Sequence, residues 1–219
     1  MKISQAVQDV LEVVPDHVTV VAAAKHRTPD EIETAIGAGI HHIGQNYVQE
    51  AEELRRAVKA DAVWHLIGHL QQNKARRALA CCDWIDSVDS LRLARRLDAI
   101  AAEMDRIFPV LVEINSGREA NKTGFLPEKV DDAVRQIADL PHLKVEGVMT
   151  MGPRFGRPED SRPYFVETRR VFERLGALQL SNVHMNILSM GMSNSYLVAI
   201  EEGANMVRLG TVLFGERPA

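Results

Sequence analysis

Apolar residues along the chain follow two alternating patterns. Eight short runs are comparatively rich in apolar residues and have the length of buried strands. These runs cover residues 18–25, 41–46, 64–68, 83–88, 109–116, 143–151, 184–190 and 206–215. Elsewhere apolar residues recur every three or four positions, which predicts helices near 2–13, 29–38, 47–60, 70–81, 90–105, 127–139, 160–178 and 194–202. Because each connection between strands contains a helix, the strands must pair in parallel.

Eight strands joined by helices form either an open doubly wound sheet or a closed barrel. No GxGxxG sequence follows the first run, and the chain has no Gly-rich phosphate loop of the Walker type. In the first run, Thr19, Val21, Ala23 and Lys25 share one face that becomes small or polar toward its end, while the opposite face is apolar and suits packing against helices. This pattern and the eightfold count favour the barrel. We therefore expect an α/β fold, a single (β/α)8 TIM-barrel domain over residues 1–219 with an extra N-terminal helix.

Net charge, the length of apolar stretches and cysteine spacing limit which partners and which cellular compartment the protein can have. The 26 Lys and Arg residues against 30 Asp and Glu residues give a net charge of −4, so neither nucleic acid nor an anionic membrane is an expected partner. No apolar stretch approaches the ~20 residues that a membrane span needs, and the polar residues in the first segment do not fit a secretion signal. The two cysteines, Cys81 and Cys82, are adjacent, a spacing that rarely permits a disulfide. We expect reduced thiols and a cytoplasmic protein.

Histidine and cysteine spacing argues against a metal site. His65 and His69 lie in or just beyond a predicted strand, where residues four positions apart are separated by ~13 Å. His41 and His42 point to opposite faces of their strand, and we expect both at the surface. No CxxC pair occurs. The sequence therefore predicts no bound metal.

Lys25 is the first candidate for chemistry. Active sites of these barrels lie at the carboxyl ends of the strands, and Lys25 ends the first strand directly after an apolar run. Apolar surroundings disfavour an ammonium group, and a neutral amine is the nucleophile that forms a Schiff base with a carbonyl compound. Position alone also fits a lysine that merely extends its amine into solvent.

The last two strands supply a candidate phosphate site. The seventh run is followed by Gly191 and Ser193, and the eighth contains Gly210 and Thr211. Phosphate groups commonly bind TIM barrels between these two loops, beside a helix N-terminus. A phosphate there and a reactive lysine across the mouth suggest a phosphorylated carbonyl ligand, although Gly, Ser and Asn are also ordinary turn residues.

Two further residues lie at strand positions that suggest contact with a ligand. Arg208 sits inside an apolar strand, where an unpaired guanidinium is costly, so it should meet a ligand or a buried carboxylate such as Glu113. Asn46 ends the second strand and can either bond a ligand hydroxyl or cap the helix that begins at Tyr47.

Eight motifs in order along nearly the whole chain make it similar to a known family. They are AAAKHR, GQNYVQE, WHLIGHLQQNK, IDSVDS, VEINSGREANKTGF, GVMTM, LSMGMSNSY and EGANMVRLGTVLFGER. With them the sequence resembles the YggS or PROSC family of pyridoxal phosphate homeostasis proteins, whose barrel is related to the N-terminal domain of alanine racemase.

The resemblance implies a cofactor and roles for individual residues. Lys25 would form the internal aldimine with pyridoxal 5′-phosphate (PLP), and Asn46 would lie near its ring. Ser189, Ser193, Gly210 and Thr211 would hold the phosphate. Arg208 would lie near the pyridine nitrogen, and because arginine cannot accept a proton, it would keep that nitrogen largely unprotonated. One departure is Gln45, where many members carry Glu; this removes a charge beside Asn46.

The resemblance also implies a role in vitamin B6 homeostasis. Such a protein binds PLP, buffers it and delivers it, with PLP-dependent apo-enzymes as possible recipients, and is regarded as non-catalytic. Alanine racemase pairs its lysine with a tyrosine from a second domain, and none of Tyr47, Tyr164 and Tyr196 matches that tyrosine. The alternative is a single-domain PLP-dependent amino-acid racemase or lyase that uses Lys25 alone. A Schiff-base aldolase acting on sugar phosphates is a third interpretation, which no motif supports.

Overall fold

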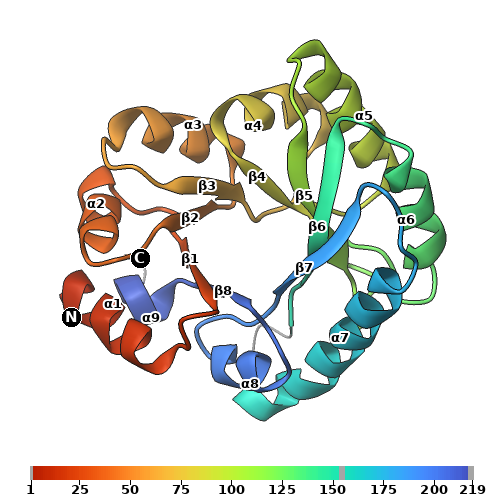
Figure 1. Cartoon of the computed structure of the whole chain (residues 1–219). Coiled ribbons are helices and arrows are strands. Elements are labelled where there is room, and N and C mark those ends of the chain that lie inside the picture. The colour runs from red at the N-terminus through yellow and green to blue at the C-terminus, as the bar shows by residue number, and fades with distance from the viewer. Residues whose placement is uncertain (1, 153–155, 217–219) are drawn as a thin grey trace.

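Eight parallel strands close into a barrel in the computed structural model, with helices around the outside (Figure 1). The structure describes residues 2–152 and 156–216; the remainder of the predicted 1–219 domain lies outside it. The strands are β1 (Thr19–Ala23), β2 (His42–Gln45), β3 (Val63–Leu66), β4 (Trp84–Val88), β5 (Phe108–Ile114), β6 (Leu143–Thr150), β7 (Val183–Ser189) and β8 (Met206–Leu209). The barrel closes where β1 pairs with β8, with Val21 beside Arg208. The predicted (β/α)8 barrel is confirmed.

The helices follow the predicted order. They are α1 (Ile3–Val13), α2 (Pro29–Gly37), α3 (Val48–Ala57), α4 (Ala75–Cys81), α5 (Leu91–Glu103), α6 (Val130–Ala138), α7 (Arg162–Gly176), α8 (Tyr196–Glu201) and α9 (Thr211–Phe214), with 3-10 turns η1 (Gln72–Lys74) and η2 (Pro158–Ser161). Helix α1 is the extra N-terminal helix. Local signals set several starts: Thr28 and Glu31 form a reciprocal capping box ahead of Pro29, and the hydroxyl of Ser90 accepts a hydrogen bond from the Leu93 amide. In the described part, no helix is long and apolar enough to cross a membrane.

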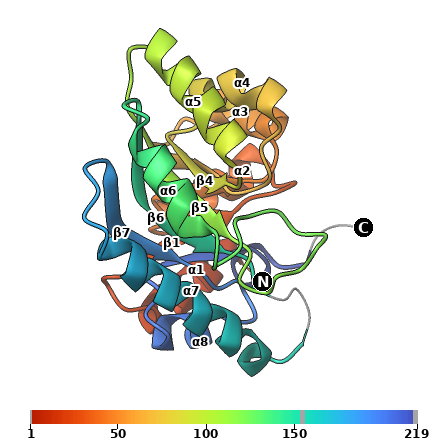
Figure 2. The same ribbon diagram turned by 90° about the vertical axis from the view of Figure 1, so that its right-hand side faces the viewer.

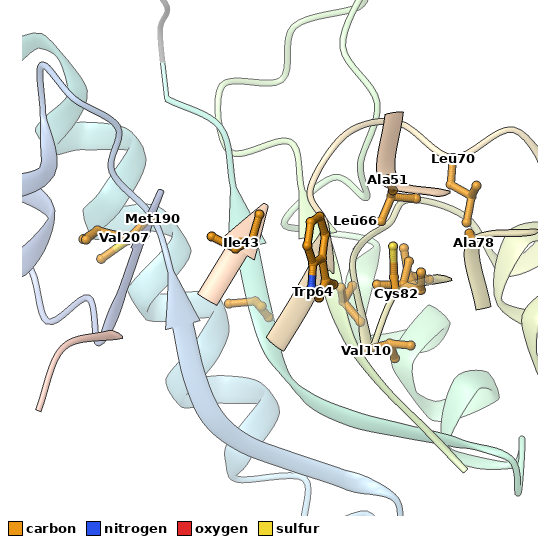
Figure 3. Close-up of a cluster of buried hydrophobic side chains, with 14 of the residues drawn as sticks. Ile43, Ala51, Trp64, Leu66, Leu70, Ala78, Cys82, Val110, Met190 and Val207 are labelled. Atoms are coloured by element: carbon orange, nitrogen blue, oxygen red, sulfur yellow. The ribbon is translucent and has the colours of Figure 1, made fainter. Parts of the chain in front are cut away.

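Two apolar layers pack against the two faces of the barrel wall. The outer layer lies between strands and helices and includes Trp64 and Ile43, which Figure 3 shows among other buried side chains. The inner layer is a small cluster inside the barrel formed by Val21, Ile67, Leu111, Met149 and Met206. On β1, Val20 and Ala22 join the outer layer and Val21 the inner one, as the alternation predicted. The inner cluster fills the barrel axis beneath the carboxyl ends of the strands.

The end of β8 differs from the prediction. The run 206–215 was expected to be one strand, but the strand stops at Leu209 and the short helix α9 follows Gly210. Leu213 and Phe214 are nevertheless buried. A short apolar run does not distinguish a strand from a buried helical turn, and this explains the error.

Strands β6 and β7 approach each other unusually closely at one point. The pairing of β6 shifts register between Val145 and Gly147, where Gly147 lies opposite Ile187 of β7. A Cβ atom at position 147 would lie 1.8 Å from the carbonyl oxygen of Ile187. Only glycine therefore permits this spacing of the two strands.

Candidate functional site

A cavity of about 480 Å³ opens at the carboxyl ends of the strands. The loop that follows β5 projects from this end of the barrel (Figure 2) and supplies part of the wall. The lining residues are Ala23, Lys25, Asn46, Ile67, Glu113, Asn121, Lys122, Thr123, Met151, Gly152, Met192 and Arg208. Lys25 follows β1, Asn46 follows β2 and Arg208 lies in β8. These three predicted site residues nevertheless face one cavity.

The amine of Lys25 lies beside an aromatic ring at the rim. Its Nζ donates a hydrogen bond to the hydroxyl of Tyr47 over 3.1 Å and lies 4.8 Å from the centre of that ring. Among the described residues, Lys25 has no carboxylate within ion-pair distance. From the sequence, Tyr47 was expected only as a helix start and as a poor match to a racemase tyrosine. The contact depends on the spatial order of β1 and β2, which the local sequence does not encode.

The backbone around Lys25 is held on both sides. The side-chain amide of Gln45 donates to the carbonyl of Ala24 over 3.1 Å, and the backbone amide of His26 donates to Glu50, whose carboxylate also lies 2.9 Å from Nδ1 of His26. His26 has a positive φ of 60°, a conformation that those contacts stabilise. Gln45 is fully buried, and its Oε1 atom has no hydrogen-bond partner. Gln45 therefore supports the strand end that carries Lys25.

Asn46 does not cap α3. The residue at the cap position is Tyr47, and the helix start has no side-chain cap. Asn46 lines the cavity instead. Of the two roles that the sequence left open, the geometry leaves Asn46 available to a ligand.

Arg208 is buried at the floor of the cavity. Its two terminal nitrogens donate to the hydroxyl of Ser189 over 2.6 Å and to the carbonyl of Thr150 over 2.7 Å. Burial lowers the pKa of the guanidinium, and the nearby charges of Asp86 and Glu113 oppose that shift. Sequence analysis named Glu113 as a possible ion-pair partner, but the groups in direct contact are neutral.

Glu113 carries a perturbed carboxyl group in the same cavity. Burial raises its pKa, against the opposing effect of a hydrogen bond that the Thr123 hydroxyl donates over 3.1 Å. Glu113 therefore holds its proton more strongly than an exposed glutamate does.

The two loops of the expected phosphate site are joined by one hydroxyl. Ser193 Oγ accepts hydrogen bonds from the backbone amides of Gly210, over 3.0 Å, and Val212, over 3.3 Å. Gly191 has a φ of 96°, and a Cβ there would lie 2.6 Å from the Cβ of Ala199, so the turn requires glycine. Thr211 is exposed at the start of α9.

Ser189 lies apart from the other residues expected to bind phosphate. Its side chain is fully buried inside the barrel, and its hydroxyl accepts a hydrogen bond from Arg208. The structure thus brings Ser193, Gly210 and Thr211 together and places the Ser189 hydroxyl with the guanidinium.

A second polar cluster lies inside the barrel and was missed by sequence analysis. Nδ1 of His65 lies 3.0 and 3.2 Å from the two carboxylate oxygens of Asp86, and its Nε2 lies 2.9 Å from Nδ1 of His42. His42 was expected at the surface, and that prediction is wrong: its ring is half-buried and faces the interior. Among residues 2–152 and 156–216, no group of three or more His, Cys, Asp or Glu side chains is arranged so that it could hold a metal ion. His42, His65 and Asp86 thus form a hydrogen-bonded chain inside the barrel.

Acid should destabilise the protein through His42. Burial and the neighbouring His65 lower the pKa of His42 from 6.5 to about 4. Between these values the unfolded chain binds a proton that the folded protein does not, so stability is full above pH 6.5 and falls as the pH drops toward 4. At about 1.4 kcal/mol per pKa unit, we expect a loss of up to about 3 kcal/mol from this group, measured by urea unfolding across that range.

Variant His42→Asn should lose this component of the pH dependence, because asparagine does not titrate. Variant His41→Asn, which changes the exposed neighbour, is the matched control and should retain it. Equal pH profiles for His42→Asn and the wild type would contradict the assignment.

Comparisons with known proteins agree with this architecture. Residues 5–218 match the family model of the alanine racemase N-terminal domain. The pyridoxal phosphate homeostasis protein of Aquifex aeolicus is 40% identical over 89% of this chain and 85% of its own. The protein of the same name from Synechocystis is 37% identical over 95% of this chain and 96% of its own.

Solved structures give the same result. PipY of Synechococcus elongatus without PLP has a TM-score of 0.91 and 34% identity, and PipY with PLP bound has a TM-score of 0.89 and 33% identity. Each match covers 97% of this chain and 100% of PipY. The chain therefore belongs to the alanine racemase N-terminal domain family, among the pyridoxal phosphate homeostasis proteins.

Proposed function

We propose that this protein binds PLP in vitamin B6 homeostasis, holding it through Lys25 and buffering or delivering it without catalytic turnover. The observation that carries the proposal is the cavity in which the Lys25 amine and the buried Arg208 guanidinium face the same space. PipY, at 33% identity, has been solved with PLP bound, and this supports the same ligand here.

The donor set fits the chemistry of PLP. The aldehyde of PLP forms an imine with a lysine amine, and Lys25 is the lysine proposed for that link. We assign the ring environment to Asn46 and Arg208, because a guanidinium donates hydrogen bonds and cannot protonate a pyridine nitrogen that faces it. For the phosphate we propose Ser193, Gly210 and Thr211. Ser189 is proposed to act through Arg208, to which it is bonded.

The arrangement of acid–base groups supports a carrier over a racemase. A two-base racemase moves protons on opposite faces of its substrate and needs one group on each face. Here the Tyr47 hydroxyl lies 3.1 Å from the Lys25 amine, so both groups stand on the same side of the cavity. The curated relatives are also named as homeostasis proteins and not as enzymes.

An absorbance titration tests the proposal. Adding PLP to the purified protein should produce a yellow imine band that borohydride removes, with the reduced pyridoxyl group on the peptide that contains Lys25. A protein that shows no such band once unbound PLP has been removed would refute the proposed function.

Proton exchange separates the carrier from the enzyme. The PLP-loaded protein, incubated with amino acids in deuterated water, should leave their α-protons unexchanged. Rapid exchange that depends on Lys25 would instead support a racemase or lyase.

The proposal also covers the partners of the protein and its cellular compartment. We propose that PLP-dependent apo-enzymes receive the cofactor and that nucleic acid and membranes are not partners, consistent with the net charge of −4. Cys81 and Cys82 are both free and buried, which supports a reducing, cytoplasmic setting.

A further inference from the structure

The two strands at the closure of the barrel separate before they reach the cavity. Strands β1 and β8 pair as far as Ala22 and Leu209. Beyond these residues, β1 leads into the turn that carries Lys25, and β8 leads through Gly210 into α9, where the phosphate site is proposed. Strand pairing therefore does not by itself set the spacing between the amine and the start of α9.

The turn after β1 is closed by a backbone hydrogen bond. The amide of Arg27 donates to the carbonyl of Ala24 over 3.2 Å, so Lys25 and His26 occupy the two central positions of the turn. His26 has its φ of 60° at the second of these positions. The place of the Lys25 backbone therefore depends on where Arg27 is held.

The side chain of Arg27 joins this turn to the far end of α9. Its Nη2 donates to the carbonyl of Gly215 over 2.6 Å, and its Nη1 donates to Oε1 of Glu31 in α2 over 3.2 Å. The central carbon of the guanidinium lies 5.3 Å from the centre of the Phe214 ring. One planar group thus connects the turn that carries Lys25 with both α2 and α9.

The guanidinium of Arg27 is held firmly in this place. Its side chain is 6% exposed, and a charge removed from water is costly to leave without its partners. The second carboxylate oxygen of Glu31 accepts a hydrogen bond from the Thr28 amide over 2.8 Å, as part of the capping box of α2. In the described part of the chain, no other hydrogen bond joins residues 24–28 to residues 210–215.

Helix α9 is a single hydrogen-bonded turn. The amides of Leu213 and Phe214 donate to the Gly210 carbonyl over 3.0 and 2.9 Å, and the amide of Gly215 donates to the Thr211 carbonyl over 2.9 Å. A unit of four residues bonded in this way is only about 6 Å long and moves as one piece. The end that the guanidinium holds and the end proposed for the phosphate therefore shift together.

We propose that Arg27 is a positioning residue of the cavity, which holds the turn that carries Lys25 against α9 and so sets the distance between the amine and the proposed phosphate loop. Arg27 is not one of the residues that line the cavity, so it acts through the backbone that it bonds. Because one ligand must meet both ends of the cavity, this role rests on the proposed function. Shifts of about 1 Å in such a paired arrangement have large effects.

Two ligands that share an aldehyde separate this role from general damage to the fold. Pyridoxal has the aldehyde of PLP but no phosphate, so its imine depends on the lysine and not on α9. The readout is the ratio of the dissociation constants of pyridoxal and PLP, both taken from the imine band. Variant Arg27→Ala should lower this ratio by roughly tenfold, because PLP no longer meets the amine and the loop together. A ratio within about twofold of the wild type would overturn the proposal.

The matched control is Arg55→Ala. Arg55 makes the same three kinds of contact as Arg27: it donates to the Ala62 carbonyl over 3.0 Å, lies 3.5 Å from the Asp83 carboxylate, and lies 5.8 Å from the centre of the Trp64 ring. Ala62 and Asp83 directly precede β3 and β4, so these contacts are at the amino ends of the strands, away from the cavity. Arg55→Ala should leave the ratio unchanged even where it lowers stability.

Amide hydrogen exchange of the ligand-free protein gives a readout that needs no PLP. The amides of Gly210 and Val212, both bonded to Ser193, should exchange roughly tenfold faster in Arg27→Ala, whereas those of β5, on the opposite side of the barrel, should change less. Acceleration no greater than that of β5 would refute the link. A wild type without an imine band would refute the proposed function alone, since exchange still decides whether Arg27 holds α9.

Variant Arg27→Lys keeps the test decisive if Arg27→Ala does not fold. Lysine retains the positive charge beside Glu31 but lacks the planar fork that bonds a carboxylate and a carbonyl at once. This variant should fold and lower the ratio for pyridoxal and PLP by about threefold or more. A folded Arg27→Lys protein with the wild-type ratio would overturn the proposal.

Discussion

Variant Lys25→Ala is expected to form no imine band with PLP and to carry no pyridoxyl group after borohydride reduction. The expected loss is complete, since the imine needs an amine at the cavity and alanine provides none. Lys25 is suited to this link because its Nζ faces the cavity and is bonded to a phenol hydroxyl. An amine tied to a carboxylate would be held as the non-nucleophilic ammonium. The measurement is the absorbance spectrum at saturating PLP, followed by peptide mapping.

Variant Lys122→Ala is the matched control. Lys122 lines the same cavity, but its Nζ forms an ion pair with the carboxylate of Glu119 at 2.5 Å. This variant should keep the band and the label on the Lys25 peptide. A band that persists in Lys25→Ala, with the label on the Lys122 peptide, would show that the proposed assignment is wrong.

Variant Gly147→Ala should lose about 3 kcal/mol or more of unfolding free energy, because the added methyl group meets backbone and not a movable side chain. Its Cβ would lie 1.8 Å from the Ile187 carbonyl oxygen and 2.7 Å from the Ile187 carbonyl carbon. Strands β6 and β7 must separate to admit it. Those strands end at Thr150 and Ser189, both bonded to Arg208, so the cavity floor should be disturbed as well.

The matched control is Gly37→Ala, and the unfolding free energies of both variants are measured in urea. Gly37 is the last residue of α2, and a Cβ there meets nothing within 4 Å. Alanine is favoured over glycine in helices by up to about 1 kcal/mol, so Gly37→Ala should be neutral or stabilising. A Gly147→Ala variant within about 1 kcal/mol of the wild type would mean that the strands yield easily at this point.

The strand and helix order was predictable because it depends on local patterns. Alternation on β1 identified both faces of the barrel wall, and Thr28 ahead of Pro29 marked the start of α2. The error at residues 211–214 has the same origin: a buried helical turn of four residues has the apolar content of a strand.

The site was predictable only where it follows from position within a strand or at its end. Lys25 and Asn46 were expected from strand ends, Arg208 was expected because it interrupts an apolar strand, and the three line one cavity. The contacts of Lys25 with Tyr47 and of Arg208 with Thr150 were not predicted. Each contact joins two strands, and the stagger between those strands is set by the closed barrel and not by the local sequence. The interior chain through His42 was missed for the same reason, since a histidine in a short strand has no local signal for the face it occupies.

The closure of the barrel between β1 and β8 also has a consequence for biosynthesis. Lys25 follows the first strand to leave the ribosome, and Arg208 lies in the last, so the cavity does not exist until β8 has been translated and has paired with β1. Contacts between such distant segments form late and slowly during folding. A nascent chain that still lacks β8 has the lysine but not the floor of the cavity, so we expect PLP capture only after β8 has paired with β1.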